Sequence, residues 1–145
     1  MADAIADQVR RLAYANPFTD MGNVPAIELC EKLVELAPGS LNHTMLSTGG
    51  STAVDTAFRL VQYYQRCRGL NDKRQIISRA DAYHGMTYAA ASIGGKPADH
   101  PDEFEFITDN IHHLSSPNQY RHGVGQTEQQ FATGLVDEFV VLIES

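Results

Sequence analysis

The segment at residues 47–55, with the sequence STGGSTAVD, combines residue types that can bind an anion. Its two glycines allow a tight turn, and Ser51 or Thr52 can cap the helix that the following residues predict. Asp55, three residues after Thr52, completes a shortened capping box. A glycine-rich turn at a helix N-terminus directs backbone N–H groups and the positive end of the helix dipole outwards. The segment predicts a phosphate site, although the same residues can also serve only to start a helix.

Residue types in this segment exclude three related motifs. A nucleotide P-loop needs a Gly-Lys-Ser/Thr triplet, which the sequence lacks. The glycines do not follow the G-x-G-x-x-G spacing of a dinucleotide site. Residues 50–53 also lack the second glycine of a nucleophile elbow. These three motifs are therefore excluded, and both a simple phosphate site and a plain helix start stay open.

Tyr83 and His84 form a second group of candidate residues, in the predicted loop at residues 80–87. Residues 74–79 predict a strand before this loop, and residues 44–47 predict a short strand before the glycine turn. Strands that alternate with helices indicate an α/β sheet with crossover connections. Because ligands gather at the carboxyl ends of such strands, both motifs are expected at the ligand-binding edge.

Hydrophobic periodicity predicts the helices that position these motifs. The predicted helices cover residues 2–12, 25–37, the stretch from the glycine turn to residue 68, residues 85–93 and residues 127–144. Residues 99–125 are expected to be mostly loop, with a possible extended piece at 104–107. A capping box over residues 127–130 starts the last helix. The side of that helix expected to be buried carries Phe131, Leu135, Val136, Phe139, Val140 and Ile143.

Three stretches, STGGSTAVDTA, RQIISRADAYHGMTYAAASIGG and YRHG, resemble the class III (omega) aminotransferases, whose usual strings are close to NSGSEAVETA and AYHG. The resemblance runs along almost the whole chain, including YANPF and LVDEFVVLIES. It implies an α/β fold that is part of the large domain of a fold-type I, pyridoxal-phosphate-dependent transferase, a three-layer α/β/α sheet that is incomplete here. Residues 1–24 would be an N-terminal helix and loop, and residues 25–145 a partial cofactor-binding large domain.

The resemblance assigns cofactor-binding roles to the two motifs. Gly50 and Ser51 would hold the phosphate of pyridoxal 5'-phosphate, Tyr83 would stack on its ring, and His84 would lie beside it. These roles fit physically, because a helix N-terminus suits a dianion and an aromatic face suits a planar heterocycle. Taken alone, Tyr83 could instead cover the core, and His84 could be a hydrogen-bonded loop residue.

Other positions are assigned less firmly or depart from the family pattern. By resemblance, Phe18 and Thr19 line the substrate pocket, although Phe18 could instead pack its own loop down. Thr52 stands where the family usually has Glu, which could loosen hydrogen bonding near the cofactor. Gly49 replaces the commoner Ser and removes one possible hydroxyl contact.

The implied activity moves an amino group from an amine or omega-amino acid to an oxo acid such as pyruvate, in a homodimeric enzyme. The chain's lysines, Lys32, Lys73 and Lys96, do not match the family's Schiff-base motif, so no catalytic residue is expected in this chain. We therefore expect an internal fragment that is inactive alone. The alternative is a non-catalytic phosphate-binding, pyridoxal-phosphate-binding or interaction module.

Composition narrows the partners of this chain. It has 145 residues with a formal net charge of −7, which gives no electrostatic basis for binding nucleic acid or anionic membranes. Cys30 and Cys67 lack a disulfide framework, so we expect reduced thiols and a cytoplasmic protein. The pair His112-His113 lacks metal-ligand spacing, so no metal site is expected.

Overall fold

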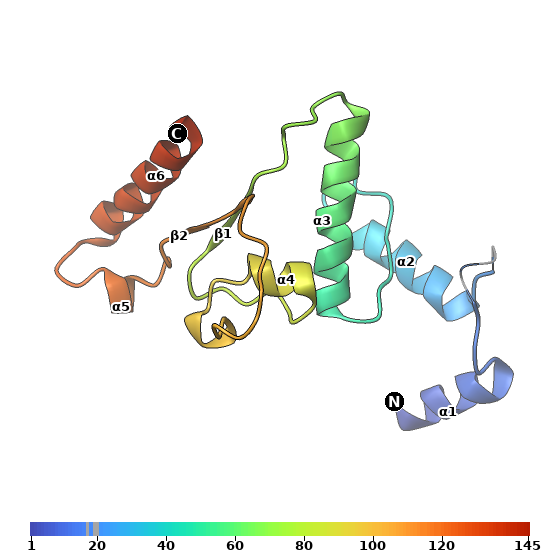
Figure 1. Ribbon diagram of the computed structural model, residues 1–145. Coiled ribbons are helices and arrows are strands. Elements are labelled where there is room, and N and C mark those ends of the chain that lie inside the picture. The colour runs from blue at the N-terminus through green and yellow to red at the C-terminus, as the bar shows by residue number, and fades with distance from the viewer. Residues whose placement is uncertain (17, 19–20) are drawn as a thin grey trace. The chain divides into compact units, whose positions relative to one another are not determined.

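The computed structural model describes residues 1–16, 18 and 21–145. The chain divides into two compact units, residues 1–46 and residues 47–145, and each is described by itself. Figure 1 labels the helices and strands in chain order. The domain boundary predicted after residue 24 stays a prediction.

The first unit contains helices α1 (Ala2–Arg11) and α2 (Val24–Leu36). Both lie where the hydrophobic spacing predicted helices. α2 begins at a side-chain cap, because the Asn23 side chain accepts a hydrogen bond from the Ala26 N–H at 3.0 Å. Pro25 occupies the first turn, where its missing N–H costs no helical hydrogen bond.

The second unit begins with α3 (Gly50–Cys67), an 18-residue helix. The predicted capping by Ser51 or Thr52 is wrong, because the N-cap is Gly49 and no side chain caps the helix. The predicted capping box is also wrong. The Asp55 carboxylate is instead used in a contact with α4 (Tyr88–Ile93), where it accepts a hydrogen bond from the Ala90 N–H.

Strands β1 (Ile76–Arg79) and β2 (Ile111–Leu114) pair in parallel, with Ile76 opposite Ile111 and Arg79 opposite Leu114. Figure 1 shows them side by side, between α4 and α6. β1 confirms the predicted strand, whereas β2 falls in a segment predicted mostly as loop. Residues 44–47 and 104–107 form no strand in the described structure, since no described strand pairs with either.

The small core of the second unit lies where α4 meets the sheet. Its buried apolar side chains are those of Ala90, Ile93, Ile111 and Leu114. Buried Ser92 is fully paired there, since its hydroxyl donates to the Tyr88 carbonyl at 2.7 Å and accepts from the Ile107 N–H at 2.9 Å. These contacts hold α4 and the loop before β2 together.

The chain continues through α5 (Gln119–His122) to α6 (Glu128–Glu144). The predicted capping box between Thr127 and Gln130 is confirmed. The predicted burial of the apolar side is wrong, because none of the residues of α6 is buried. Within the described structure, α6 meets mainly β2 and the Ser115 N–H, to which Glu138 offers both carboxylate oxygens. Among the described residues, no helix is both long enough and apolar enough to cross a membrane.

Candidate functional site

The N-terminus of α3 presents backbone N–H groups without a side-chain cap. The first backbone hydrogen bond of the helix runs from the Ala53 N–H to the Gly49 carbonyl at 3.0 Å, so the amides of Gly50, Ser51 and Thr52 precede the helical ladder. Both glycines are exposed, and a β-carbon built on either would find no atom within 4 Å. We call Gly50 and Ser51, with these free amides and open space, the anion cradle.

Ser51 is held by the residues that follow the Tyr83-His84 loop. Its hydroxyl accepts a hydrogen bond from the Met86 N–H at 3.1 Å, and its carbonyl accepts one from the Thr87 hydroxyl at 3.3 Å. Because a serine hydroxyl has one hydrogen and two lone pairs, the bond from Met86 leaves that hydrogen available for an anion. The arrangement orients the Ser51 hydroxyl as a donor.

Gly85 allows the close approach between this loop and the helix. The residue is buried and has a φ of 130°, in the region that favours glycine. A β-carbon at this position would lie 2.4 Å from the Ser51 hydroxyl oxygen and 2.8 Å from the Ser51 Cα. A larger residue would therefore displace Ser51 or the loop.

Tyr83 and His84 come just after β1, at its carboxyl end, as expected. The Tyr83 side chain is 62% exposed, so its ring does not cover the core. His84 is half-buried, and its Nε2 lies 3.2 Å from the hydroxyl of Ser78 in β1. That hydrogen bond fixes the imidazole and is compatible with either interpretation of His84. The structure thus brings the two predicted motifs into one region.

Asp55 is a functional candidate that the sequence reasoning missed. Its Oδ1 accepts a hydrogen bond from the Ala90 N–H at 2.8 Å, and the two residues are 35 positions apart. The bond ties α3, which carries the anion cradle, to α4, which follows the Tyr83-His84 loop. The sequence contained no signal for it, because the Asp55 partner is a backbone group of a distant element.

Thr52 organises the turn before α3. Its hydroxyl oxygen lies 2.5 Å from that of Ser47 and 3.2 Å from that of Thr48, and it donates to the Gly49 carbonyl at 2.9 Å. A glutamate at this position could not reproduce the same compact hydroxyl cluster. The departure from the family pattern therefore builds a turn closed by its own side chains.

The remaining predicted residues are less informative. Phe18 is 94% exposed, so the alternative that it packs its loop down is wrong. Thr19 lies outside the described residues. Lys32 pairs with Glu35 at 2.7 Å and Lys96 lies 3.7 Å from Asp99, both on the surface. These two lysines are held by local ion pairs.

The adjacent histidines of β2 face different surroundings, as their position on a strand predicts. His112 Nε2 lies 2.8 Å from the side-chain oxygen of Gln75, and His113 Nε2 lies 3.1 Å from the carbonyl of Ile93. Within the described part of the chain, no group of three or more His, Cys, Asp or Glu side chains could hold a metal ion.

The anion cradle has the features that a phosphate monoester attached to a flat ring requires. Free amides at the start of α3 and the Ser51 hydroxyl supply hydrogen-bond donors, and the helix dipole favours a dianion. The exposed ring of Tyr83 supplies an aromatic face nearby along the loop. The residues present therefore fit a phosphorylated heterocycle, and their chemistry here is binding and orientation.

Comparison with known proteins gives a consistent result. A sequence profile of the family described as "Aminotransferase class-III" matches residues 1–143. The chain is 30% identical to putrescine–pyruvate aminotransferase of Pseudomonas aeruginosa, over 95% of this chain and 30% of that protein. It is 35% identical to a probable aminotransferase of Mycobacterium tuberculosis, over 99% of this chain and 30% of that protein.

A solved structure agrees with the described fold. The (S)-enantioselective omega-transaminase from Thermomicrobium roseum matches with a TM-score of 0.92 and 35% identity, over 99% of this chain and 32% of that chain. Agreement over nearly the whole length confirms the predicted α/β fold class. The chain spans about 30% of the length of the curated relatives that it matches.

Proposed function

Because the chain belongs to the class-III aminotransferase family, as its motifs predicted, we propose that it supplies the phosphate-binding part of a pyridoxal-phosphate-dependent aminotransferase. The observation that carries the proposal is the clamp on Ser51. Met86 and Thr87 hold this residue at the open start of α3, with its hydroxyl hydrogen left to donate. A residue that only started a helix would not need a distant loop to orient its hydroxyl.

Each residue of the site has a distinct part in binding. The amides of Gly50 and Ser51 and the Ser51 hydroxyl would hold the cofactor phosphate at the positive end of the α3 dipole. Tyr83 would lie against the ring, and His84, fixed by Ser78, would limit the ring's movement. When bound, pyridoxal phosphate supplies an electron-withdrawing ring that stabilises negative charge on the substrate carbon bearing the nitrogen.

The substrate class is a proposal for the whole protein, and it is supported by the relatives. We propose that it transfers an amino group from an amine or omega-amino acid to an oxo acid such as pyruvate. Support comes from relatives named as a putrescine–pyruvate aminotransferase and as gamma-aminobutyrate transaminases. The 145-residue chain by itself would bind the cofactor without turning over an amine, since none of its lysines contacts the anion cradle in the described structure.

The test compares a phosphorylated ligand with its phosphate-free analogue. Pyridoxamine 5'-phosphate is preferable to pyridoxal phosphate, because it has no aldehyde to react with surface lysines. Calorimetric titration of the purified chain should detect binding of pyridoxamine 5'-phosphate and much weaker binding of pyridoxamine. Ser51→Ala should weaken phosphate-dependent binding about tenfold, the value of one charge-assisted hydrogen bond.

Two controls make the result interpretable. Circular dichroism of the free chain and of Ser51→Ala establishes that both are folded before titration. Ser92→Ala removes a hydroxyl that is buried and bonded within the core, away from the cradle, and should leave the preference for the phosphate intact. Equal affinity of the folded chain for the phosphorylated and unphosphorylated ligands would contradict the proposal.

A further inference from the structure

A second concavity lies at the opposite edge of the sheet from the anion cradle. It has a volume of about 550 Å³. Arg74 lies just before β1 and Asn110 just before β2, so the concavity adjoins the amino ends of both strands. At a rise of about 1.5 Å per residue, Arg59 and Arg66 of α3 lie about 12 and 22 Å from Ser51 along the helix. The two sites are therefore separate.

The lining of this concavity is strongly positive. It includes four cationic side chains, Arg59, Arg66, Lys73 and Arg74, and one carboxylate, that of Asp109. The whole chain has 11 basic and 18 acidic residues, so this local excess opposes the net charge of −7. We call this concavity, with its four cationic side chains, the basic concavity.

The cations of the basic concavity are not neutralised by neighbours. In the described structure, no ion pair or hydrogen bond involves the side-chain nitrogens of any of the four. Other basic residues do pair, as Arg10 does with Asp7 at 2.8 Å. Like charges that share a concavity repel one another, and a bound anion would relieve that repulsion.

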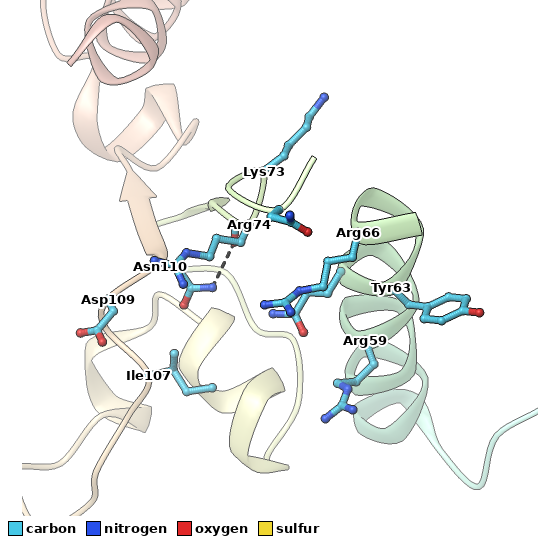
Figure 2. A pocket seen from close by; sticks show the side chains of 10 residues that line it. Arg59, Tyr63, Arg66, Lys73, Arg74, Ile107, Asp109 and Asn110 are labelled. Carbon is cyan, nitrogen blue, oxygen red and sulfur yellow. Dashed lines mark hydrogen bonds between the residues drawn. The ribbon is translucent and has the colours of Figure 1, made fainter. Parts of the chain in front are cut away.

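The positions of the four cationic side chains determine which of them can bind the same anion. Arg59 and Arg66 are seven residues apart, about two helical turns, so they share one face of α3. Figure 2 shows both side chains extending from α3 on the side of Ile107 and Asn110, whereas Tyr63 extends on the other side. The side chain of Lys73 points away from the two arginines. Arg59 and Arg66 are therefore the leading ligand candidates.

The wall opposite α3 is held by a hydrogen bond from a side chain to a backbone carbonyl. The Asn110 side-chain amide donates to the Arg74 carbonyl at 3.0 Å, which joins the two segments that precede the strands (Figure 2).

The size and side chains of the basic concavity indicate the kind of ligand it can bind. Arginine guanidinium groups bind phosphate and carboxylate in a bidentate manner, and a volume of this size suits a small molecule. Tyr63 adds no charge near neutral pH, because a phenol ordinarily has a pKa near 10, and the neighbouring Cys67 raises the pKa of Tyr63 further.

We propose that the basic concavity binds a small multivalent oxyanion of the phosphate or polycarboxylate class through Arg59 and Arg66. This site is independent of the anion cradle and of the proposed aminotransferase chemistry. An anion with two or more charges engages both guanidinium groups at once, whereas a monovalent anion engages one.

Amide-resolved NMR titration of the 145-residue chain tests the site directly. The probes are inorganic pyrophosphate and citrate, with acetate as the monovalent comparison, all at constant ionic strength because salt screens exposed charges. Pyrophosphate should cause saturable shifts in amides near Arg59, Arg66 and Asn110, with acetate at least about tenfold weaker. Saturation by citrate as well assigns the broad oxyanion class, and saturation by pyrophosphate alone assigns phosphate. No saturable shift at this site, or shifts confined to Gly50 and Ser51, overturns the proposal.

Paired variants separate a built site from general charge. Arg59→Gln combined with Arg66→Gln should weaken pyrophosphate binding about tenfold or more, since two charge-assisted contacts are lost. The matched control, Arg11→Gln with Arg121→Gln, makes the same charge change elsewhere and should have little effect. Equal weakening by both pairs overturns the proposal. The Arg59→Lys, Arg66→Lys pair keeps the charge and should weaken binding by an intermediate amount.

The outcome is distinguishable from that of the aminotransferase proposal. Ser51→Ala should leave the shifts near Arg59 and Arg66 unchanged, because the cradle and the basic concavity share no residue. The Arg59→Gln, Arg66→Gln pair should likewise leave the pyridoxamine 5'-phosphate shifts at Gly50 and Ser51 unchanged. Loss of the Gly50 and Ser51 shifts in the Arg59→Gln, Arg66→Gln variant would contradict a separate site.

Discussion

Gly85 and Ser51 approach so closely that a β-carbon on the glycine would lie 2.4 Å from the serine hydroxyl oxygen. This contact joins the Tyr83-His84 loop to the first turn of α3. The neighbouring Met86 N–H completes it with a hydrogen bond to the same oxygen across 35 positions of sequence. The two motifs to which the family resemblance assigns cofactor binding therefore form one structural unit.

Gly85→Ala should damage both stability and cofactor binding. The new methyl group meets Ser51, and the φ of 130° is strained for any residue with a β-carbon. We expect a loss of about 1–3 kcal/mol in the free energy of unfolding, measured by urea denaturation. Pyridoxamine 5'-phosphate affinity should also fall.

Gly125→Ala is the matched control for that variant. Gly125 also has a positive φ, of 81°, but a β-carbon there meets no atom within 4 Å. The control should show backbone strain without loss of ligand affinity. If Gly85→Ala bound the phosphorylated ligand as well as the control does, the close contact with Ser51 would have no functional role.

Asp55 should act as a positioning residue through its bond to Ala90. Asp55→Ala removes the acceptor and leaves a partly buried N–H unpaired, so the free energy of unfolding should fall by about 1–3 kcal/mol. Asp55→Asn keeps a side-chain carbonyl at the same place and should retain most of the stability. Denaturation curves and the affinity for pyridoxamine 5'-phosphate should change together across the two variants. Equal losses in both would show that charge, not the hydrogen bond, matters at this position.

Gly49→Ser should be tolerated and should strengthen phosphate binding. Gly49 has an extended φ of 175°, which any residue adopts, and open space surrounds its missing β-carbon. The added hydroxyl restores the residue type that the family commonly has there. We expect unchanged stability within about 0.5 kcal/mol, as for other surface substitutions. Calorimetry should show tighter binding of pyridoxamine 5'-phosphate, and a weaker affinity would place the phosphate elsewhere.

Tyr83 should contribute its aromatic face and little to folding. Its side chain is 62% exposed, so Tyr83→Ala should leave the urea midpoint nearly unchanged. The same variant should weaken ligand binding about tenfold if a ring-on-ring contact is lost. Tyr83→Phe keeps the ring and should bind like the original chain. Normal binding by Tyr83→Ala would remove this residue from the site.

The sequence-based predictions that the structure confirms concern mostly local interactions. Thr127 and Gln130 form their capping box because the partners lie within one helical turn. A general rule for α/β sheets predicted that the glycine turn and the Tyr83-His84 loop lie together. The contact between Ser51 and Met86 confirms that they do, although the strand predicted before the glycine turn is not present in the described structure.

The errors share a different physical cause, which is tertiary structure. Asp55 has a cap-like position, yet a distant backbone N–H is its partner. β2 is only four residues long and carries His112-His113 in its middle, so its two buried ends give no recognisable alternation. The apolar side of α6 is a sound helical pattern, but hydrophobic spacing cannot say which surface, if any, will cover it.

The most direct measurement is an amide-resolved NMR titration of the chain with pyridoxamine 5'-phosphate and, separately, with pyridoxamine. The account predicts that the largest phosphate-dependent shifts occur at Gly50 and Ser51, followed by Met86, whose N–H bonds the Ser51 hydroxyl. Shifts that are the same for both ligands, or that centre on other residues, would contradict a phosphate site at the start of α3.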